Sequence, residues 1–132
     1  MRLLQLAVLS SGKGTNLLAI IKAVKNGIIP CKICVVCTNK KCDAHDIATQ
    51  YKIPTIQSIS PEFKNKSERE EYDINLANLL KKATPDIVVL VDWLHILTNK
   101  FIDKFRNIIN LHPALPNTFK GANAIEDAFA AY

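Results

Sequence analysis

The sequence predicts an α/β protein built on a doubly wound, mostly parallel sheet of five strands. Short apolar runs alternate along the chain with longer amphipathic segments, which is the pattern of repeated strand–helix units around a parallel sheet. The run DIVVLV at residues 86–91 is continuously apolar after its first residue, as expected for a central strand buried on both faces. With 132 residues, 48% of them hydrophobic and 22% charged, the chain has the size and composition of one globular domain, and residues 1–132 are treated as such.

Flanking residues justify the individual elements. The apolar N-terminal stretch is too short for a secretory signal and no separate cleavage site follows it, so a buried strand is the simpler interpretation. Asp43 is a helix cap, Pro54 places the third strand near a sheet edge, and Ser67 with Glu70 forms a capping box. The predicted strands are 3–9, 31–37, 53–56, 86–91 and 107–111, and the predicted helices are 17–26, 43–51, 67–83, 99–105 and 122–131.

The four cysteines superficially resemble iron–sulfur ligands, because Cys31, Cys34 and Cys37 have C-x2-C-x2-C spacing and Cys42 follows. The segment CKICVVC reads as a buried strand, however, which places Cys31 and Cys37 on one face and Cys34 on the other. One strand cannot bring them together around a cluster. We therefore interpret them as small buried hydrophobic residues in a protein of a reducing compartment, the cytoplasm, and predict no metal site.

The formal net charge of +5 permits an anionic partner without identifying one. The basic residues form small groups separated by acidic ones, and no aromatic residues alternate with them to make a base-stacking surface. A solvated surface is thus favoured over a nucleic-acid interface. No apolar run approaches the roughly 18 residues that a membrane helix needs, so we expect no membrane partner.

Parallel sheets bind ligands beyond the carboxyl ends of their strands, and three such ends carry polar or bulky residues. The first is SSGKGTN, residues 10–16, where small residues let backbone N–H groups at a helix start face an anion. It lacks the spacing of a Walker A loop and of the dinucleotide fingerprint. It is a candidate phosphate loop, and the alternative is a tight turn that only connects strand and helix.

The other two ends follow residues 91 and 110. The segment VDWLHIL, residues 91–97, could form a wall for a flat ligand, although core packing is the more frequent role of such residues. Asn110 and His112 are two residues apart at a strand end and so share a face. An imidazole beside a side-chain amide can stabilise an oxyanion and move protons in acyl transfer, although a single loop histidine is more often structural.

The chain resembles the phosphoribosylglycinamide formyltransferases of purine biosynthesis, which use 10-formyltetrahydrofolate as formyl donor. The resemblance extends over nearly the whole sequence and is carried by VLSSGKGTNLLAII, REEYDINLANLL, PDIVVLVDWLHIL and, most specifically, INLHPALPNTFKG. Related formyl-folate enzymes share the Asn-x-His pattern, but SGKGTN directly after the first strand is more similar to the glycinamide-ribotide enzyme. The resemblance implies a Rossmann-like formyltransferase fold and small-molecule substrates.

The resemblance also implies a role for individual residues. The amine of phosphoribosylglycinamide would attack the N10-formyl carbon, and the charge of the tetrahedral intermediate would be stabilised by Asn110 and His112, with His112 as proton donor. The substrate's ribose phosphate would be bound by Gly14, Thr15 and Asn16, and the folate by Arg69, Leu94, His95, Ile96, Leu97 and Asn110.

Two departures from the family pattern bear on activity. The family continues past the position of Tyr132 and supplies there an Asp that raises the pKa of the catalytic His, so we expect a slow or inactive enzyme, the alternative being a non-catalytic phosphoribosyl-binding remnant. The same truncation would leave a sheet edge open to self-association. Asp92 stands where the family has a small residue. It either replaces the missing carboxylate beside His112 or caps the following segment and faces water.

Overall fold

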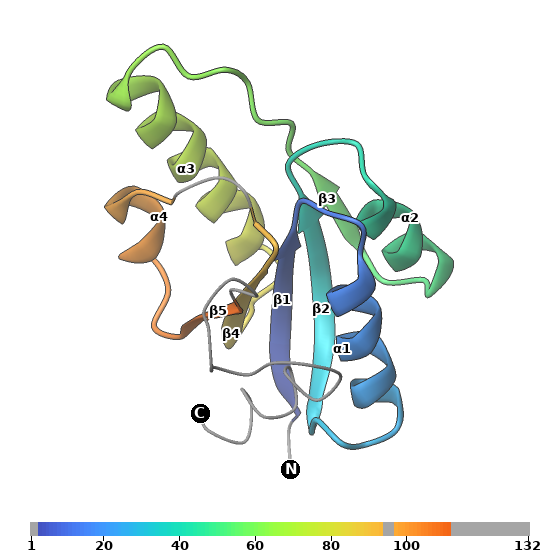
Figure 1. The fold of residues 1–132 in the computed structure, drawn as a ribbon. Helices are drawn as coiled ribbons and strands as arrows, with labels where there is room; N and C mark the ends of the chain where they lie inside the picture. The colour runs from blue at the N-terminus through green and yellow to red at the C-terminus, as the bar shows by residue number, and fades with distance from the viewer. Residues whose placement is uncertain (1–2, 94–96, 112–132) are drawn as a thin grey trace, which may run out of the picture.

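A computed structural model describes residues 3–93 and 97–111. Five parallel strands form a single sheet in the order β3-β2-β1-β4-β5, which confirms the predicted doubly wound sheet and the edge position of the third strand (Figure 1). The predicted helix 122–131 lies outside the described residues. The elements in chain order are β1 Leu4–Ser10, α1 Thr15–Lys25, β2 Cys31–Thr38, α2 Asp43–Gln50, β3 Thr55–Gln57, α3 Lys66–Lys81, β4 Ile87–Val91, α4 Asn99–Ile102 and β5 Ile108–Leu111.

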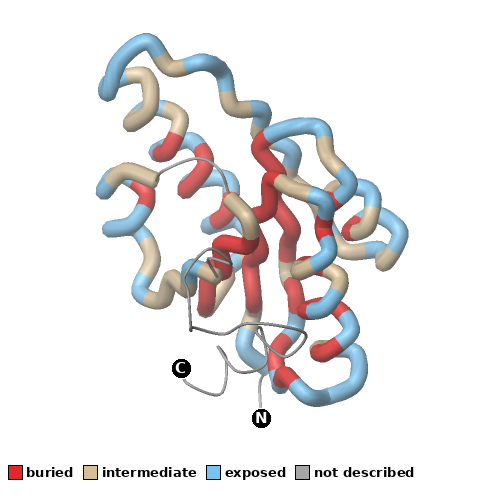
Figure 2. Tube along the Cα trace, viewed as in Figure 1, coloured by how far each residue is buried: buried red, intermediate tan, exposed pale blue. Residues whose placement is uncertain are grey.

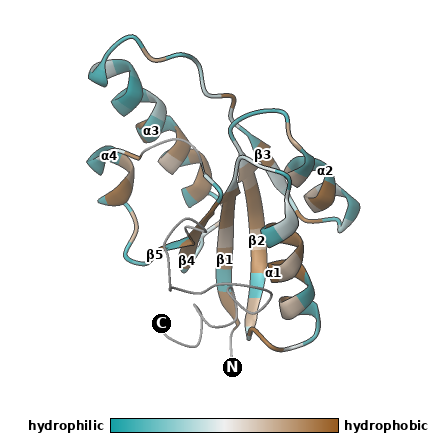
Figure 3. Cartoon of the chain, viewed as in Figure 1, coloured by the Kyte–Doolittle hydropathy of each residue, from teal (hydrophilic) through white to brown (hydrophobic). Residues whose placement is uncertain are grey.

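The described helices cover the sheet in two layers, with α1 and α2 on one face and α3 and α4 on the other (Figure 1). Each face has its own apolar cluster. Leu6, Val8 and Val89 pack toward α1 and α2, whereas Leu9 and Val88 pack toward α3 and α4. The alternation follows from the pleat of each strand. Buried residues concentrate in the central strands β1, β2 and β4 (Figure 2), which are also the most hydrophobic ones (Figure 3).

Strand β4 is buried along its whole length, as the apolar run predicted. Asp86, which the sequence analysis placed in this strand, comes just before it and has a different task. Its Oδ2 accepts a hydrogen bond from the backbone N–H of Gln5 at 2.7 Å, and its own N–H donates to the carbonyl oxygen of Gln5 at 2.8 Å. These two bonds fasten the amino end of β4 to β1.

Two predicted helix caps are wrong. Helix α3 is capped by Asn65, whose side-chain oxygen accepts a hydrogen bond from the Glu68 backbone N–H at 2.9 Å, and not by Ser67. The Glu68 carboxylate in turn accepts from the Lys64 N–H at 3.0 Å, so a reciprocal cap exists two residues earlier than the Ser67–Glu70 pattern predicted. Helix α2 has Cys42 at its N-cap position, and Asp43 is its first helical residue, where a carboxylate favours the helix dipole.

The faces predicted for the cysteines are also wrong, although their interpretation as packed apolar residues agrees with the structure. The pairing of β1 with β2 shifts at Cys34, which is passed over between Ile33 and Val35. Such a bulge reverses the alternation that follows it. Cys31 therefore packs toward α1 and α2, whereas Cys34 and Cys37 pack toward α3 and α4.

The described part of the chain contains no group of three or more His, Cys, Asp or Glu side chains placed to hold a metal ion. All four cysteines are unpaired thiols, and burial raises the pKa of Cys37 to about 12. None of the helices described is long and apolar enough to span a membrane.

Candidate functional site

The candidate site lies at the carboxyl edge of the sheet, between β1 and β4. From β1 the chain proceeds to β2 and β3 on one side, and from β4 it proceeds to β5 on the other. The connections leaving β1 and β4 therefore diverge, and doubly wound proteins bind ligands at this topological switch point. The two connections are joined here by a hydrogen bond of 3.2 Å from the Ser11 backbone N–H to the Asp92 carbonyl oxygen.

The loop between β1 and α1 has the features of an anion site. Gly14 occupies the N-cap position of α1, and neither a side-chain cap nor an acidic residue is present in the first turn. The N–H groups that begin the helix therefore have no side-chain acceptor, and the helix dipole gives that end partial positive charge. Thr15 is exposed, Asn16 is half-buried, and the cationic side chain of Lys13 is exposed in the same loop.

Gly14 is required here by conformation and by space. Its φ of +83° lies in the left-handed region, and an added Cβ would come within 2.6 Å of Ile47 Cδ1 and 3.1 Å of Ala44 Cα. Helix α2 packs against the loop at this point, and the Ala44 N–H donates to the Gly12 carbonyl oxygen at 3.3 Å. The loop is thus held in a single shape by the neighbouring helix.

A buried hydrogen bond that sequence reasoning missed joins the loop to the end of β2. Ser11 Oγ donates to Asn39 Oδ1 at 2.7 Å, and both side chains are buried. The preceding residues Ser10 and Thr38 are register partners, and their buried hydroxyl oxygens have no hydrogen-bond partner among residues 3–93 and 97–111. The available sequence signal was the polar pair Thr38-Asn39 at the carboxyl end of a buried strand.

Asp92 contacts the loop with its side chain as well as its backbone. Its Oδ2 accepts a hydrogen bond from Asn16 Nδ2 at 3.0 Å, and its φ of +54° lies in the left-handed region. Within the described residues the Asp92 carboxylate bonds to the β1–α1 loop, and the prediction that it caps the segment after β4 concerns residues 94–96, which lie outside the described part. The residue is half-buried, its carboxylate holds Asn16, and the N-cap of α4 is Thr98. The other prediction for Asp92, that it replaces the missing carboxylate beside His112, concerns a residue outside the described part.

The segment after β4 is held in place by hydrogen bonds to a residue of α3. Asp73, which is fully buried on α3, accepts hydrogen bonds at Oδ2 from the Thr98 backbone N–H at 2.6 Å and from Thr98 Oγ1 at 2.7 Å. Trp93 and Leu97 are half-buried and pack against the apolar cluster on this face, which agrees with the core-packing interpretation of both. Leu94, His95 and Ile96, predicted to line the folate pocket, lie outside the described residues.

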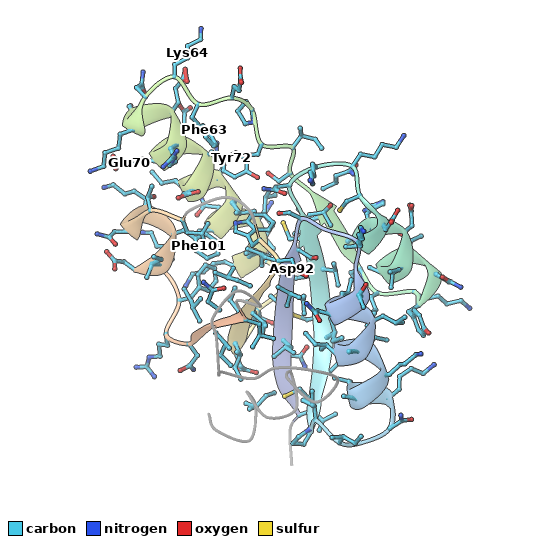
Figure 4. The ribbon with its side chains drawn as sticks, in the orientation of Figure 1. Phe63, Lys64, Glu70, Tyr72, Asp92 and Phe101 are labelled. Atoms are coloured by element: carbon cyan, nitrogen blue, oxygen red, sulfur yellow. The ribbon has the colours of Figure 1, made fainter. Side chains whose placement is uncertain are left out.

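Of the remaining predicted site residues, the structure describes Asn110 and Arg69. Asn110 is exposed on β5 beside Leu90 of β4, while His112 lies outside the described residues. Arg69 is in the first turn of α3, half-buried, with its guanidinium 5.7 Å from the ring centroid of Phe63. Figure 4 shows Phe63 at the outer end of α3, away from Asp92. The structure therefore brings together Gly14, Asn16 and Asp92, and it does not bring Arg69 to them.

This arrangement defines a class of protein, a doubly wound α/β domain with an uncapped helix start at its switch point. The sequence matches the family described as Formyl transferase over residues 4–131. The chain belongs to the formyl transferase family.

Relatives and solved structures agree with this assignment. The chain is 40% identical to the phosphoribosylglycinamide formyltransferase of Schizosaccharomyces pombe, over 96% of this chain and 66% of the relative. It is 37% identical to that of Haemophilus influenzae, over 96% of this chain and 59% of the relative. Its fold matches the Coxiella burnetii phosphoribosylglycinamide formyltransferase structure with a TM-score of 0.77 at 32% identity, covering 98% of this chain and 61% of that one. The chain thus spans less than two thirds of these relatives' length.

Proposed function

We propose that this chain takes part in the transfer of a formyl group from 10-formyltetrahydrofolate to the amine of phosphoribosylglycinamide, a step of purine biosynthesis. The observation that carries the proposal is the loop between β1 and α1, an uncapped helix start beside the end of β4 in a member of the formyl transferase family. The names of the relatives supply the substrate, and the loop supplies a place for its phosphate.

The phosphate of the substrate binds at Gly14, Thr15 and Asn16 in this proposal. Backbone N–H groups at a helix start hydrogen-bond phosphate oxygens, and the helix dipole favours the negative charge. The left-handed backbone of Gly14 and its contact with α2 hold these groups in place before the ligand arrives. Such preorganisation reduces the entropy that binding costs.

The formyl donor occupies the α3 and α4 side of the edge. The apolar residues Leu94 and Ile96, which follow β4 in the sequence, suit contact with a flat pteridine ring. The donor supplies the formyl carbon. Asn110 donates its amide N–H to the formyl oxygen as the substrate amine attacks, and His112 stabilises the resulting oxyanion. When the tetrahedral intermediate collapses, the bond between the formyl carbon and N10 breaks, His112 donates a proton to the leaving N10, and the attacking amine gives up its own proton, which leaves tetrahydrofolate and the formylated amine. The folate-binding residues in this proposal are Arg69, Leu94, His95, Ile96, Leu97 and Asn110, and the chemistry uses no metal.

We further propose a cytoplasmic location, as befits four unpaired thiols, and small molecules as the partners. Self-association is a separate proposal that rests on β5. Within the described residues this strand pairs only with β4, so its other edge offers backbone groups to a second copy. Sedimentation over a concentration series tests it, and a strictly monomeric chain would contradict it.

A coupled assay tests the function. The chain is mixed with phosphoribosylglycinamide and 10-formyltetrahydrofolate, and release of tetrahydrofolate is followed by absorbance. We expect release that depends on phosphoribosylglycinamide and falls about 10²- to 10³-fold in His112→Ala. Calorimetric binding of phosphoribosylglycinamide without turnover would favour a non-catalytic remnant of the enzyme. If the chain showed no binding and no turnover, both the enzyme hypothesis and the remnant hypothesis would be overturned. A steeply salt-dependent affinity for nucleic acid would point to a nucleic-acid-binding function instead.

A further inference from the structure

We propose that Asp92 is a specificity-determining residue, which selects sugar phosphates over free phosphate at the loop between β1 and α1. Its Oδ2 holds Asn16 in place, and its Oδ1 accepts a hydrogen bond from a hydroxyl group of the ligand's sugar. The inference rests on the proposed function, because it concerns the same phosphoribosyl subsite. It adds the residue that recognises the sugar.

The first argument is placement. Asp92 directly follows β4 at the switch point, next to Val91, which pairs with the last residue of β1, Ser10. Figure 4 shows it near the carboxyl end of β1, between the two helical layers. Its carbonyl oxygen is bonded to the Ser11 N–H, and a Cβ on Gly12 would lie 3.6 Å from Asp92 Cβ. Because the Asn16 amide reaches its carboxylate at 3.0 Å, a ligand bound at the start of α1 lies within a few bond lengths of Asp92.

The second argument is the conformation and the bonding of the residue. A φ of +54° is unfavourable for a residue with a Cβ, and such strain concentrates at functional positions. Oδ2 is satisfied by Asn16, whereas Oδ1 makes no hydrogen bond to any residue that the structure describes. Among the residues that the structure describes, one oxygen of the half-buried carboxylate thus has no donor, and this oxygen can accept from a ligand.

The third argument is electrostatic. A carboxylate beside an anion site repels free phosphate, so on its own it weakens the binding for which the loop is built. A ligand that carries both a phosphate and neighbouring hydroxyl groups offsets this repulsion, because each hydroxyl can donate to the carboxylate. Asp92 thus combines an attractive contact with the right ligand and a repulsive one with the wrong ligand, which is how binding sites discriminate.

Asp92→Asn tests the proposal, because it removes the charge and keeps an oxygen that can accept from Asn16. The affinities of the chain for inorganic phosphate and for ribose 5-phosphate are measured from the amide NMR signals of residues 12–17. We expect ribose 5-phosphate to bind roughly tenfold more weakly to the variant, the loss of one charge-assisted hydrogen bond. We expect inorganic phosphate to bind as tightly as before or tighter. Asp92→Gly, which suits a left-handed φ, relieves the backbone strain. Like Asp92→Asn, it should weaken the binding of ribose 5-phosphate and not that of inorganic phosphate.

The control is Asp103→Asn, which removes the same charge at an exposed position after α4 and should change neither affinity. Equal weakening of both ligands by Asp92→Asn would show that Asp92 only supports the loop, and would overturn the inference while leaving the proposed function intact. Failure of both ligands to bind the unaltered chain would overturn the inference together with the proposed phosphate loop.

Discussion

The two halves of the carboxyl edge are built in different ways. On the β1 side, the loop depends on its backbone, with a left-handed glycine, an uncapped helix start and a helix packed against it. On the β4 side, the chain is held by carboxylates, with Asp92 bonded to Asn16 and Asp73 bonded to Thr98. The first half consists mainly of main-chain groups, and Asn39 and Ala44 hold it from the end of β2 and from α2. The second depends on partners 76 and 25 residues away.

Because the two halves are built differently, they should respond differently to substitutions. The loop after β1 tolerates no added atom at Gly14, because its shape follows from φ, ψ and the packing of α2 against it. A half held by side-chain acceptors loses one hydrogen bond at a time, and each loss leaves a donor without a partner. Substitutions in the two halves should therefore lower the free energy of unfolding by different amounts.

The largest effect is expected for Gly14→Ala. The added Cβ meets both Ile47 and Ala44 in a left-handed backbone, so we expect the free energy of unfolding to fall by about 3 kcal/mol, from strain and overpacking together. Gly27→Ala is the matched control, because φ is +75° there and nothing lies within 4 Å of the added atom. It should cost about 1 kcal/mol. Urea unfolding measures both, and equal losses would show that α2 does not press on the loop.

The next effect is expected for Asp73→Ala. Removal of the buried carboxylate leaves the Thr98 N–H and hydroxyl without this acceptor, and we expect a loss of about 2 kcal/mol in unfolding free energy. Asp103→Ala, at an exposed position on the same side, should change stability by less than about 0.5 kcal/mol. If thermal and urea unfolding gave the same small loss for both variants, the β4 half would not depend on α3 as described.

A pH effect on stability tests the sheet beneath both halves. Burial holds the pKa of Cys37 at about 12, whereas its unperturbed value is 9.0. Above pH 9 the unfolded chain releases this proton while the folded chain keeps it, so stability is lost as pH rises through the window from 9 to 12. Between pH 8 and 10 the unaltered protein should lose about 1 kcal/mol more than Cys37→Ala. Parallel losses in the two proteins would contradict the burial of this thiol.

The smallest effect is expected at the outer end of α3. Asn65→Ala removes the cap on the Glu68 N–H and should lower the unfolding free energy by about 1 kcal/mol. Ser67→Ala, the cap that the sequence predicted, lies inside the helix and should leave stability almost unchanged. A larger loss of thermal stability for Ser67→Ala than for Asn65→Ala would show that Ser67 caps the helix after all.

The sequence predicted what depends on local pattern. The alternation of strands and helices, the edge position of the third strand and the loop at residues 10–16 were all visible in short windows of residues. It did not predict the bulge at Cys34, because neither the partner strand nor its register is written in the CKICVVC pattern. Nor did it predict that Asn39 holds Ser11 or that Asp92 holds Asn16, since these contacts form only after distant strand ends meet.

The central claim is that the switch point between β1 and β4 binds the phosphoribosyl group. Its most direct test is a titration of the isotope-labelled chain with phosphoribosylglycinamide, followed through every backbone amide signal. We expect the largest shifts at residues 12–17, with a further shift at Asp92. Saturable shifts confined to other parts of the chain, or no shifts at millimolar ligand, would contradict it.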